Sequence, residues 1–199
     1  MAGIACGKLK STNALTALEE LIVSTENKDP ILRHSGIMGL VGVATLRQLE
    51  DFVDHPSEAM RIAAVIALRH LGGIKELTKF IKDDSPQVMS DAIRAIYDEA
   101  QTQTFLDHPK SLSVIAEALN PQHPPAVNVR AIAANRRLGT IVSAKRISTF
   151  LANPNLSHNL RIQGLYALKS WSKASRLDPI DGRYFPVLAG DMDALKEAI

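Results

Sequence analysis

Five segments of the chain repeat one pattern of apolar and small side chains. Each segment opens on a bulky apolar residue, and the five openings are Leu32, Met60, Val88, Val127 and Leu160. Small residues follow four and seven positions later, and apolar residues follow mostly at eight and eleven. These offsets lie on one face of an α-helix, where small side chains let a neighbouring helix approach closely. The pattern therefore predicts five helices that pack through the same stripe.

Start and stop signals agree with these five helices. Each has a proline at or just before its first turn, where a missing N–H is tolerated; the prolines are Pro30, Pro56, Pro86, Pro125 and Pro154. Side chains suited to N-capping precede three of the helices, at Asp29, Ser85 and Asn153. Glycines suited to ending a helix follow two of them, at Gly72 and Gly139.

Shorter stretches with helical periodicity fill the gaps, at residues 13–23, 46–53, 74–81, 111–119 and 144–151. A lone amphipathic pair cannot bury its apolar face, so such pairs must stack on one another. We expect an all-α, right-handed α-solenoid of about five helix pairs over residues 13–173. An N-terminal tail would precede it at residues 1–12, and a capping loop with the start of a further, truncated helix would follow at residues 174–199.

Composition and charge narrow the classes of function. Hydrophobic residues make up 46% of the chain and aromatic residues only 5%, which suits helices packed through small side chains. The formal net charge of +2 at pH 7 disfavours nucleic acid as a partner. Cys6 is the single cysteine, so no internal disulfide can form. No apolar run is long enough to span a bilayer.

Two of the long helices resemble a known repeat. Residues 60–72 read Met-Arg-Ile-Ala-Ala-Val-Ile-Ala-Leu-Arg-His-Leu-Gly and resemble the second helix of a HEAT-like repeat of the PBS-lyase type, as do residues 160–168. The resemblance covers residues 13–173 and implies HEAT-like helix pairs. The chain departs from the family pattern at four positions, namely Met89, Asn128, Glu99 and Asn135.

The C-terminal stretch carries a more particular resemblance. Residues 167–171 read Ala-Leu-Lys-Ser-Trp, and residues 178–186 follow the pattern D-x-x-x-G-R-x-x-P. This combination is similar to the HEAT region of large secreted bacterial proteins that join a glucose/sorbosone-dehydrogenase-like propeller to a c-type haem domain. The resemblance implies a periplasmic or secreted parent in which this piece spaces two redox modules; without it we expect a cytoplasmic protein. It implies no cofactor here, because the haem attachment pattern C-x-x-C-H is absent.

Arginine recurs directly after the opening residue in three of the repeats, at Arg33, Arg61 and Arg161. A basic ladder along a groove is one interpretation. A residue that recurs at the same position of each repeat more often stabilises the contact between adjacent repeats. We therefore expect these arginines to pair with carboxylates or helix ends. We expect a solvated face, rather than a phosphate site, for the densest basic cluster, which comprises Arg130, Arg136, Arg137, Lys145 and Arg146.

The remaining candidates also have structural interpretations. Trp171 is expected to be buried beneath a loop at residues 176–186, whose structural positions are Asp178, Asp181, Gly182 and Arg183. No spacing of histidines suits zinc. We expect turn roles for the histidines that precede proline, namely His55, His108 and His123.

The function predicted from these patterns is a non-catalytic protein-interaction or spacer scaffold, a fragment of a larger multidomain protein. Its partner would be another domain of the parent chain or a separate protein. The candidate interaction surface consists of positions expected to be exposed on the second helices, namely Arg69, Arg94, Tyr97, Arg137 and Lys169. The alternatives are a HEAT-like enzyme, either bilin-lyase-like or DNA-alkylation-repair-like, and a nucleic-acid-binding solenoid.

Overall fold

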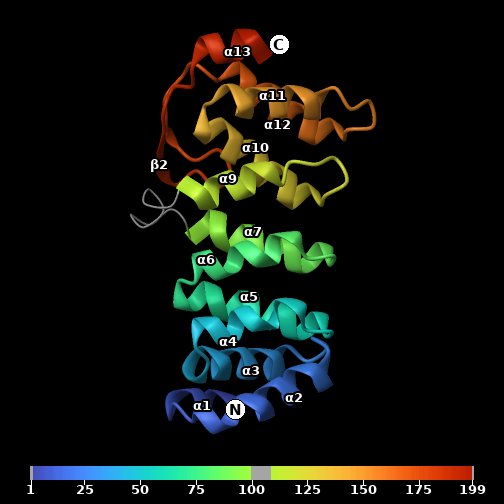
Figure 1. The fold of residues 1–199 in the computed structure, drawn as a ribbon, viewed down its shortest axis with the longest axis vertical. Coiled ribbons are helices and arrows are strands. Elements are labelled where there is room, and N and C mark those ends of the chain that lie inside the picture. The colour runs from blue at the N-terminus through green and yellow to red at the C-terminus, as the bar shows by residue number, and fades with distance from the viewer. Residues whose placement is uncertain (1, 100–108, 199) are drawn as a thin grey trace. The chain divides into compact units, whose positions relative to one another are not determined.

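Helices dominate the computed structural model, which describes residues 2–99 and 109–198 (Figure 1). The prediction of an all-α protein is confirmed. The chain divides into two compact units, residues 1–99 and residues 100–199. Within the described residues, no helix is both long and apolar enough to cross a membrane.

The first unit is built around three long helices that lie side by side (Figure 1). They are α3 (Pro30–Val43), α5 (Glu58–Leu71) and α7 (Pro86–Glu99). The helix α3 packs against α1, α2 and α5, and α5 packs in turn against α7. The shorter elements of this unit are α1 (Ala2–Lys8), η1 (Thr12–Ala14), α2 (Leu15–Thr25), α4 (Leu46–Asp51), η2 (Phe52–Asp54), α6 (Ile74–Leu77) and η3 (Thr78–Lys82).

The second unit continues with α9 (Pro109–Glu117), α10 (Pro125–Leu138), α11 (Ile141–Leu151) and α12 (His158–Lys169). Here α10 packs against α9, α11 and α12. A short antiparallel ribbon of β1 (Ser175–Leu177) and β2 (Tyr184–Val187) follows, with Leu177 opposite Tyr184. The last helix, α13 (Met192–Ala198), packs against α11. The sequence pattern had no strand-like alternation that would predict the ribbon.

The predicted stripe forms the buried face of the long helices. Four of its five opening residues are buried, whereas Leu32 is 37% exposed. Asn135, which interrupts the apolar stripe of α10, is also buried. Its amide nitrogen donates 2.9 Å hydrogen bonds to the carbonyl oxygens of Ala116 and Ala131. Because these bonds satisfy its amide hydrogens, Asn135 joins α10 to the end of α9 instead of breaking the stripe.

Most of the predicted helix ends are confirmed. The Asp29 carboxylate accepts hydrogen bonds from two backbone N–H groups of α3, and the Ser85 hydroxyl does the same for α7. Gly72 and Gly139 end their helices with positive φ values of 71° and 62°, a conformation that favours glycine. The prediction for Asn153 is wrong. Its side chain accepts from the N–H of Asn155 in the preceding turn, and Ser157 caps α12.

Within the segment expected as an N-terminal tail, residues 2–8 form the helix α1. Gly3 and Gly7 are buried against α3. A Cβ built on Gly42 of α3 would lie 2.3 Å from Cα of Gly7, so the two backbones approach closely only because both positions are glycine. Glycine lowers helix propensity by about 1 kcal/mol, which explains why the local pattern did not predict this helix.

Candidate functional site

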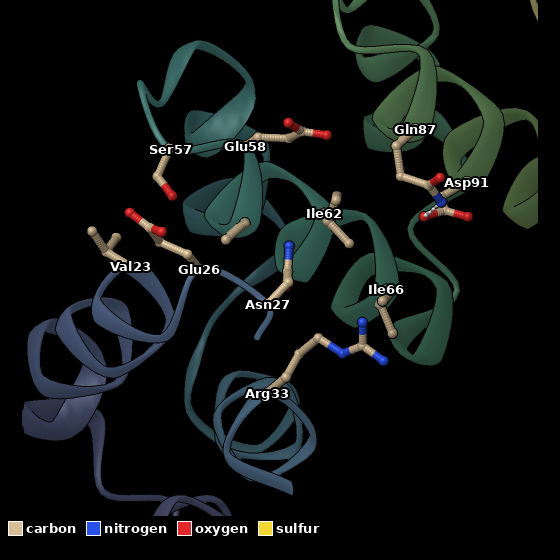
Figure 2. A pocket seen from close by; sticks show the side chains of 11 residues that line it. Val23, Glu26, Asn27, Arg33, Ser57, Glu58, Ile62, Ile66, Gln87 and Asp91 are labelled. Atoms are coloured by element: carbon tan, nitrogen blue, oxygen red, sulfur yellow. Dashed lines mark hydrogen bonds between the residues drawn. The ribbon is translucent and has the colours of Figure 1, made fainter. Parts of the chain in front are cut away.

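An open cleft of about 900 Å³ lies in the first unit, between the α2–α3 turn, α5 and the first turns of α7. Figure 2 shows side chains from all three elements pointing into one space. The cleft has three parts: an apolar floor, a set of carboxylates and one arginine.

The apolar floor comes mainly from α5. Ile62 and Ile66 lie one helical turn apart on the same face, and Val23 at the end of α2 adds a third apolar side chain (Figure 2). Ile62 is almost fully buried, whereas Val23 is 36% exposed. Ile66 is half-buried, so the exposed part of the floor, which Ile66 and Val23 supply, can pack against one apolar side chain of a bound molecule.

Three carboxylates surround this floor, and each already accepts one hydrogen bond. Glu58 accepts from the Ser85 hydroxyl at 2.8 Å, and Asp91 accepts from the Gln87 amide at 2.9 Å. Glu26 accepts from Lys28 at 2.7 Å. That hydrogen bond, with the charge of Lys28, lowers the pKa of Glu26 below its ordinary value. An ionised carboxylate offers about four acceptor sites, so these groups can still accept from a ligand.

The recurrent arginines separate into two kinds. Arg61 donates to the Asp83 carboxylate at 2.7 and 3.1 Å and to the carbonyl oxygen of His55 at 2.8 Å. Arg161 donates to the carbonyl oxygens of Leu151 and Asn153 at 2.8 and 2.9 Å. The expected pairing with carboxylates and helix ends is confirmed for these two residues, whose side chains hold the turns between helices.

Arg33 departs from that pattern. Its side chain is partly buried, lines the cleft and extends toward Ile66 (Figure 2). It makes no hydrogen bond or ion pair with any residue in the ranges 2–99 and 109–198. The turn before α3 differs in its backbone, because Glu26 and Asn27 both have positive φ values, of 46° and 59°. The described residues therefore show no architectural pairing for Arg33.

The predicted interaction surface is corrected at two of its five positions. Arg69, Arg94 and Lys169 are exposed as expected. Tyr97 is completely buried, and the Arg137 side chain is only 4% exposed because it pairs with Asp178. None of the five positions lines the cleft. The sequence did hold one signal of the cleft. Ile62 and Ile66 are apolar residues one helical turn apart that lie beside the predicted stripe.

Two arginines of the basic cluster that we expected to be solvated, Arg136 and Arg137, have buried side chains instead. Arg136 donates to the carbonyl oxygens of Leu188, Ser170 and Lys173 at 2.6 to 2.9 Å. Its guanidinium carbon lies 5.7 Å from the centre of the Trp171 ring. Burial lowers the pKa of Arg136 below its ordinary value. The prediction of a solvated face fails here because the C-terminal segment covers this end of α10.

The burial of Trp171 is confirmed, but the covering segment lies further along the chain. The indole N–H donates to the carbonyl oxygen of Asp191 at 2.9 Å, and the backbone N–H of Gly190 donates to the Trp171 carbonyl oxygen at 2.7 Å. The expected roles in the loop are confirmed: the Asp178 carboxylate accepts from two backbone N–H groups, Asp181 pairs with Arg183, and Gly182 has a φ of 71°.

Two of the histidines that precede proline take part in turns. Nε2 of His55 lies 3.3 Å from a carboxylate oxygen of Glu19, and Nδ1 of His55 accepts a hydrogen bond from the N–H of Ser57. Nδ1 of His123 lies 2.8 Å from the carbonyl oxygen of Ala118. His108 lies outside the described residues. Within those residues, no group of three or more His, Cys, Asp or Glu side chains could hold a metal ion.

A second exposed apolar surface lies on α12. Ile162, Leu165 and Tyr166 are each about half exposed or more, at 49%, 54% and 62%. Their spacing places them on neighbouring rows of one helix. This surface belongs to the second unit, and the cleft belongs to the first.

Comparison with known proteins identifies no relative: the chain matches no protein-family model, no curated protein and no solved structure.

Proposed function

We propose that this chain is a non-catalytic protein-interaction scaffold that binds a segment of a partner protein in the cleft of the first unit. The observation that carries the proposal is the combination of an apolar floor with charged groups of both signs in one open cleft. Clefts that bind ligands specifically combine apolar surface with a few placed polar groups. The proposed partner is another domain of a longer parent chain or a separate protein.

The proposed architecture is a HEAT-like, right-handed stack of about five helix pairs. The serial packing of α3, α5 and α7, and of α10 and α12, supports it within each unit. We further propose that such a stack acts as a spacer in a secreted protein with a dehydrogenase-like propeller and a c-type haem domain. The support for this parent is the Trp171 helix end and the D-x-x-x-G-R-x-x-P loop.

Selection from a display library of random peptides tests the binding function. The full chain should enrich a set of related peptides, and the variants Ile66→Asp and Asp91→Lys should enrich them poorly. Each variant places an unfavourable charge in the cleft, and we expect binding to weaken roughly tenfold, which corresponds to 1.4 kcal/mol.

The matched control is Asp51→Lys, which reverses an exposed carboxylate on α4 that does not line the cleft. This variant should select the same peptides as the unaltered chain. If no peptide family is enriched, or if Asp51→Lys changes the selection as much as Asp91→Lys, the cleft is not the binding site.

A further inference from the structure

We infer that Arg33 binds a carboxylate of the partner, so that the cleft recognises a peptide segment in which an acidic and a basic residue flank an apolar one. The inference rests on the proposed function and names the chemistry of its ligand. The acidic residue would pair with Arg33, the apolar side chain would pack mainly on Ile66, and the basic residue would face Glu58 and Asp91.

Arg33 differs in its hydrogen bonding from the arginines at the equivalent positions of other repeats. Arg61 and Arg161 occupy the same slot, and each has guanidinium hydrogens bonded to carbonyl or carboxylate oxygens. Arg33 is partly buried, yet its five N–H donors have no partner among the described residues. Its planar guanidinium matches a carboxylate in a bidentate geometry that lysine cannot reproduce.

Arg33 and two of the carboxylates lie on different helices of the cleft. Arg33 lies on α3, whereas Glu58 lies on the first turn of α5 and Asp91 on the second turn of α7 (Figure 2). A purely acidic segment would be repelled by these two carboxylates, and a purely basic one would leave Arg33 unpaired. A segment that carries both charges satisfies both sides.

The apolar floor lies between the charged groups of the cleft. Ile62 and Ile66 lie along α5 between Arg33 and the carboxylates (Figure 2). An apolar side chain that packs there removes water from the neighbouring ion pairs. Charge-assisted bonds are stronger in such a partly desolvated site than at an open surface. The apolar residue of the partner therefore belongs between its two charged residues.

The test compares the peptides that three forms of the full chain select from the same random display library. The unaltered chain should enrich peptides with Asp or Glu on one side of an apolar residue and Lys or Arg on the other. Arg33→Glu should replace the acidic preference with a basic one and retain the apolar residue. The matched control, Arg47→Glu, alters an exposed arginine on α4 outside the cleft and should leave the selection unchanged.

Affinity measurements with one selected, fluorescently labelled peptide complete the test. Arg33→Gln should weaken its binding by roughly 10- to 100-fold, because it removes a charge-assisted pair. A companion peptide with its acidic residue changed to Ala should bind the unaltered chain and Arg33→Gln equally. Thermal unfolding followed by circular dichroism should give similar midpoints for all forms, because Arg33 forms no hydrogen bond with any turn in the part of the chain that the structure describes.

Three results would overturn the inference. The selected peptides could lack an acidic residue, Arg33→Glu could select the same peptides as the unaltered chain, or Arg33→Gln could bind the labelled peptide as tightly. In each case the proposed function would stand if Ile66→Asp and Asp91→Lys still enrich the selected peptides poorly. Failure to enrich any peptide would instead overturn the proposed function, and this inference with it.

Discussion

At the scale of single residues, a buried ion pair fixes the loop that follows β1. The Arg137 and Asp178 side chains pair directly, and they are only 4% and 0% exposed. Asp178 also orders the loop through the N–H groups of Ile180 and Asp181. Removing one partner of a buried pair leaves the other charge without compensation, which costs more than the pair itself contributes.

We therefore predict that Asp178→Asn lowers the free energy of unfolding of the second unit by about 3–5 kcal/mol. Asparagine keeps the acceptor oxygen for the loop and removes only the charge. Denaturant unfolding followed by Trp171 fluorescence measures the loss, because Trp171 is the only tryptophan.

The control for this prediction is Asp193→Asn, which removes one partner of an exposed ion pair with Lys196. Exposed pairs contribute up to about 1 kcal/mol, so this change should shift the unfolding curve little. Equal effects of the two substitutions would contradict a special role for the buried pair.

At the scale of elements, the position of α1 depends on glycines. Gly3 approaches Ser35, and Gly7 approaches Gly39 and Gly42, so the backbones of α1 and α3 lie almost in contact. A helix of seven residues is marginal in isolation. We conclude that packing against α3, rather than local propensity, keeps residues 2–8 helical.

Gly42→Ala should displace α1 from α3. The added Cβ would lie 2.3 Å from both Cα and the carbonyl oxygen of Gly7, an overlap that side-chain rotation cannot relieve. Overpacking of this kind costs about 1–3 kcal/mol, and the better helix propensity of alanine offsets only part of it.

Amide hydrogen exchange measures the displacement directly. The amides at the end of α1, such as that of Leu9, which donates to Ala5 at 3.0 Å, should exchange faster in Gly42→Ala than in the unaltered chain. His34→Ala, an exposed change on the same helix, should not affect them. Unchanged exchange in Gly42→Ala would show that α1 is helical without this contact.

At the scale of the whole molecule, charge balance bears on the class of partner. The chain has 23 Lys and Arg against 21 Asp and Glu. Arg136 and Arg137, from the densest basic cluster, form internal bonds to the C-terminal segment. Because duplex DNA is bound through many phosphate contacts from exposed basic residues, these two residues add nothing to such a surface.

We therefore predict no tight, salt-sensitive binding of duplex DNA. A gel-shift titration at low and at physiological salt would test this prediction, because each phosphate contact contributes to the salt dependence of binding. Tight binding that falls steeply with salt would contradict the scaffold proposal and favour a nucleic-acid enzyme of the DNA-alkylation-repair-like class.

Much of the secondary structure could be predicted from the sequence because it depends on neighbours within a few turns. The apolar stripe, the N-caps at Asp29 and Ser85 and the stops at Gly72 and Gly139 are local features, and all are confirmed. The candidate site could be predicted far less well. The sequence indicated an interaction surface on the second helices, but Tyr97 and Arg137 are buried, and the cleft residues were not singled out together.

By itself, the sequence determined which residues form the long helices and which face of each helix is buried. It could do so because helical periodicity and capping depend on residues that are close together in the chain. Only the tertiary structure decided which charged side chains find partners, since those partners come from distant segments. Arg61 and Arg33 occupy equivalent slots, yet Arg61 meets Asp83 while Arg33 faces an open cleft. In the same way, α1 is a helix because α3 offers Gly39 and Gly42 for close approach.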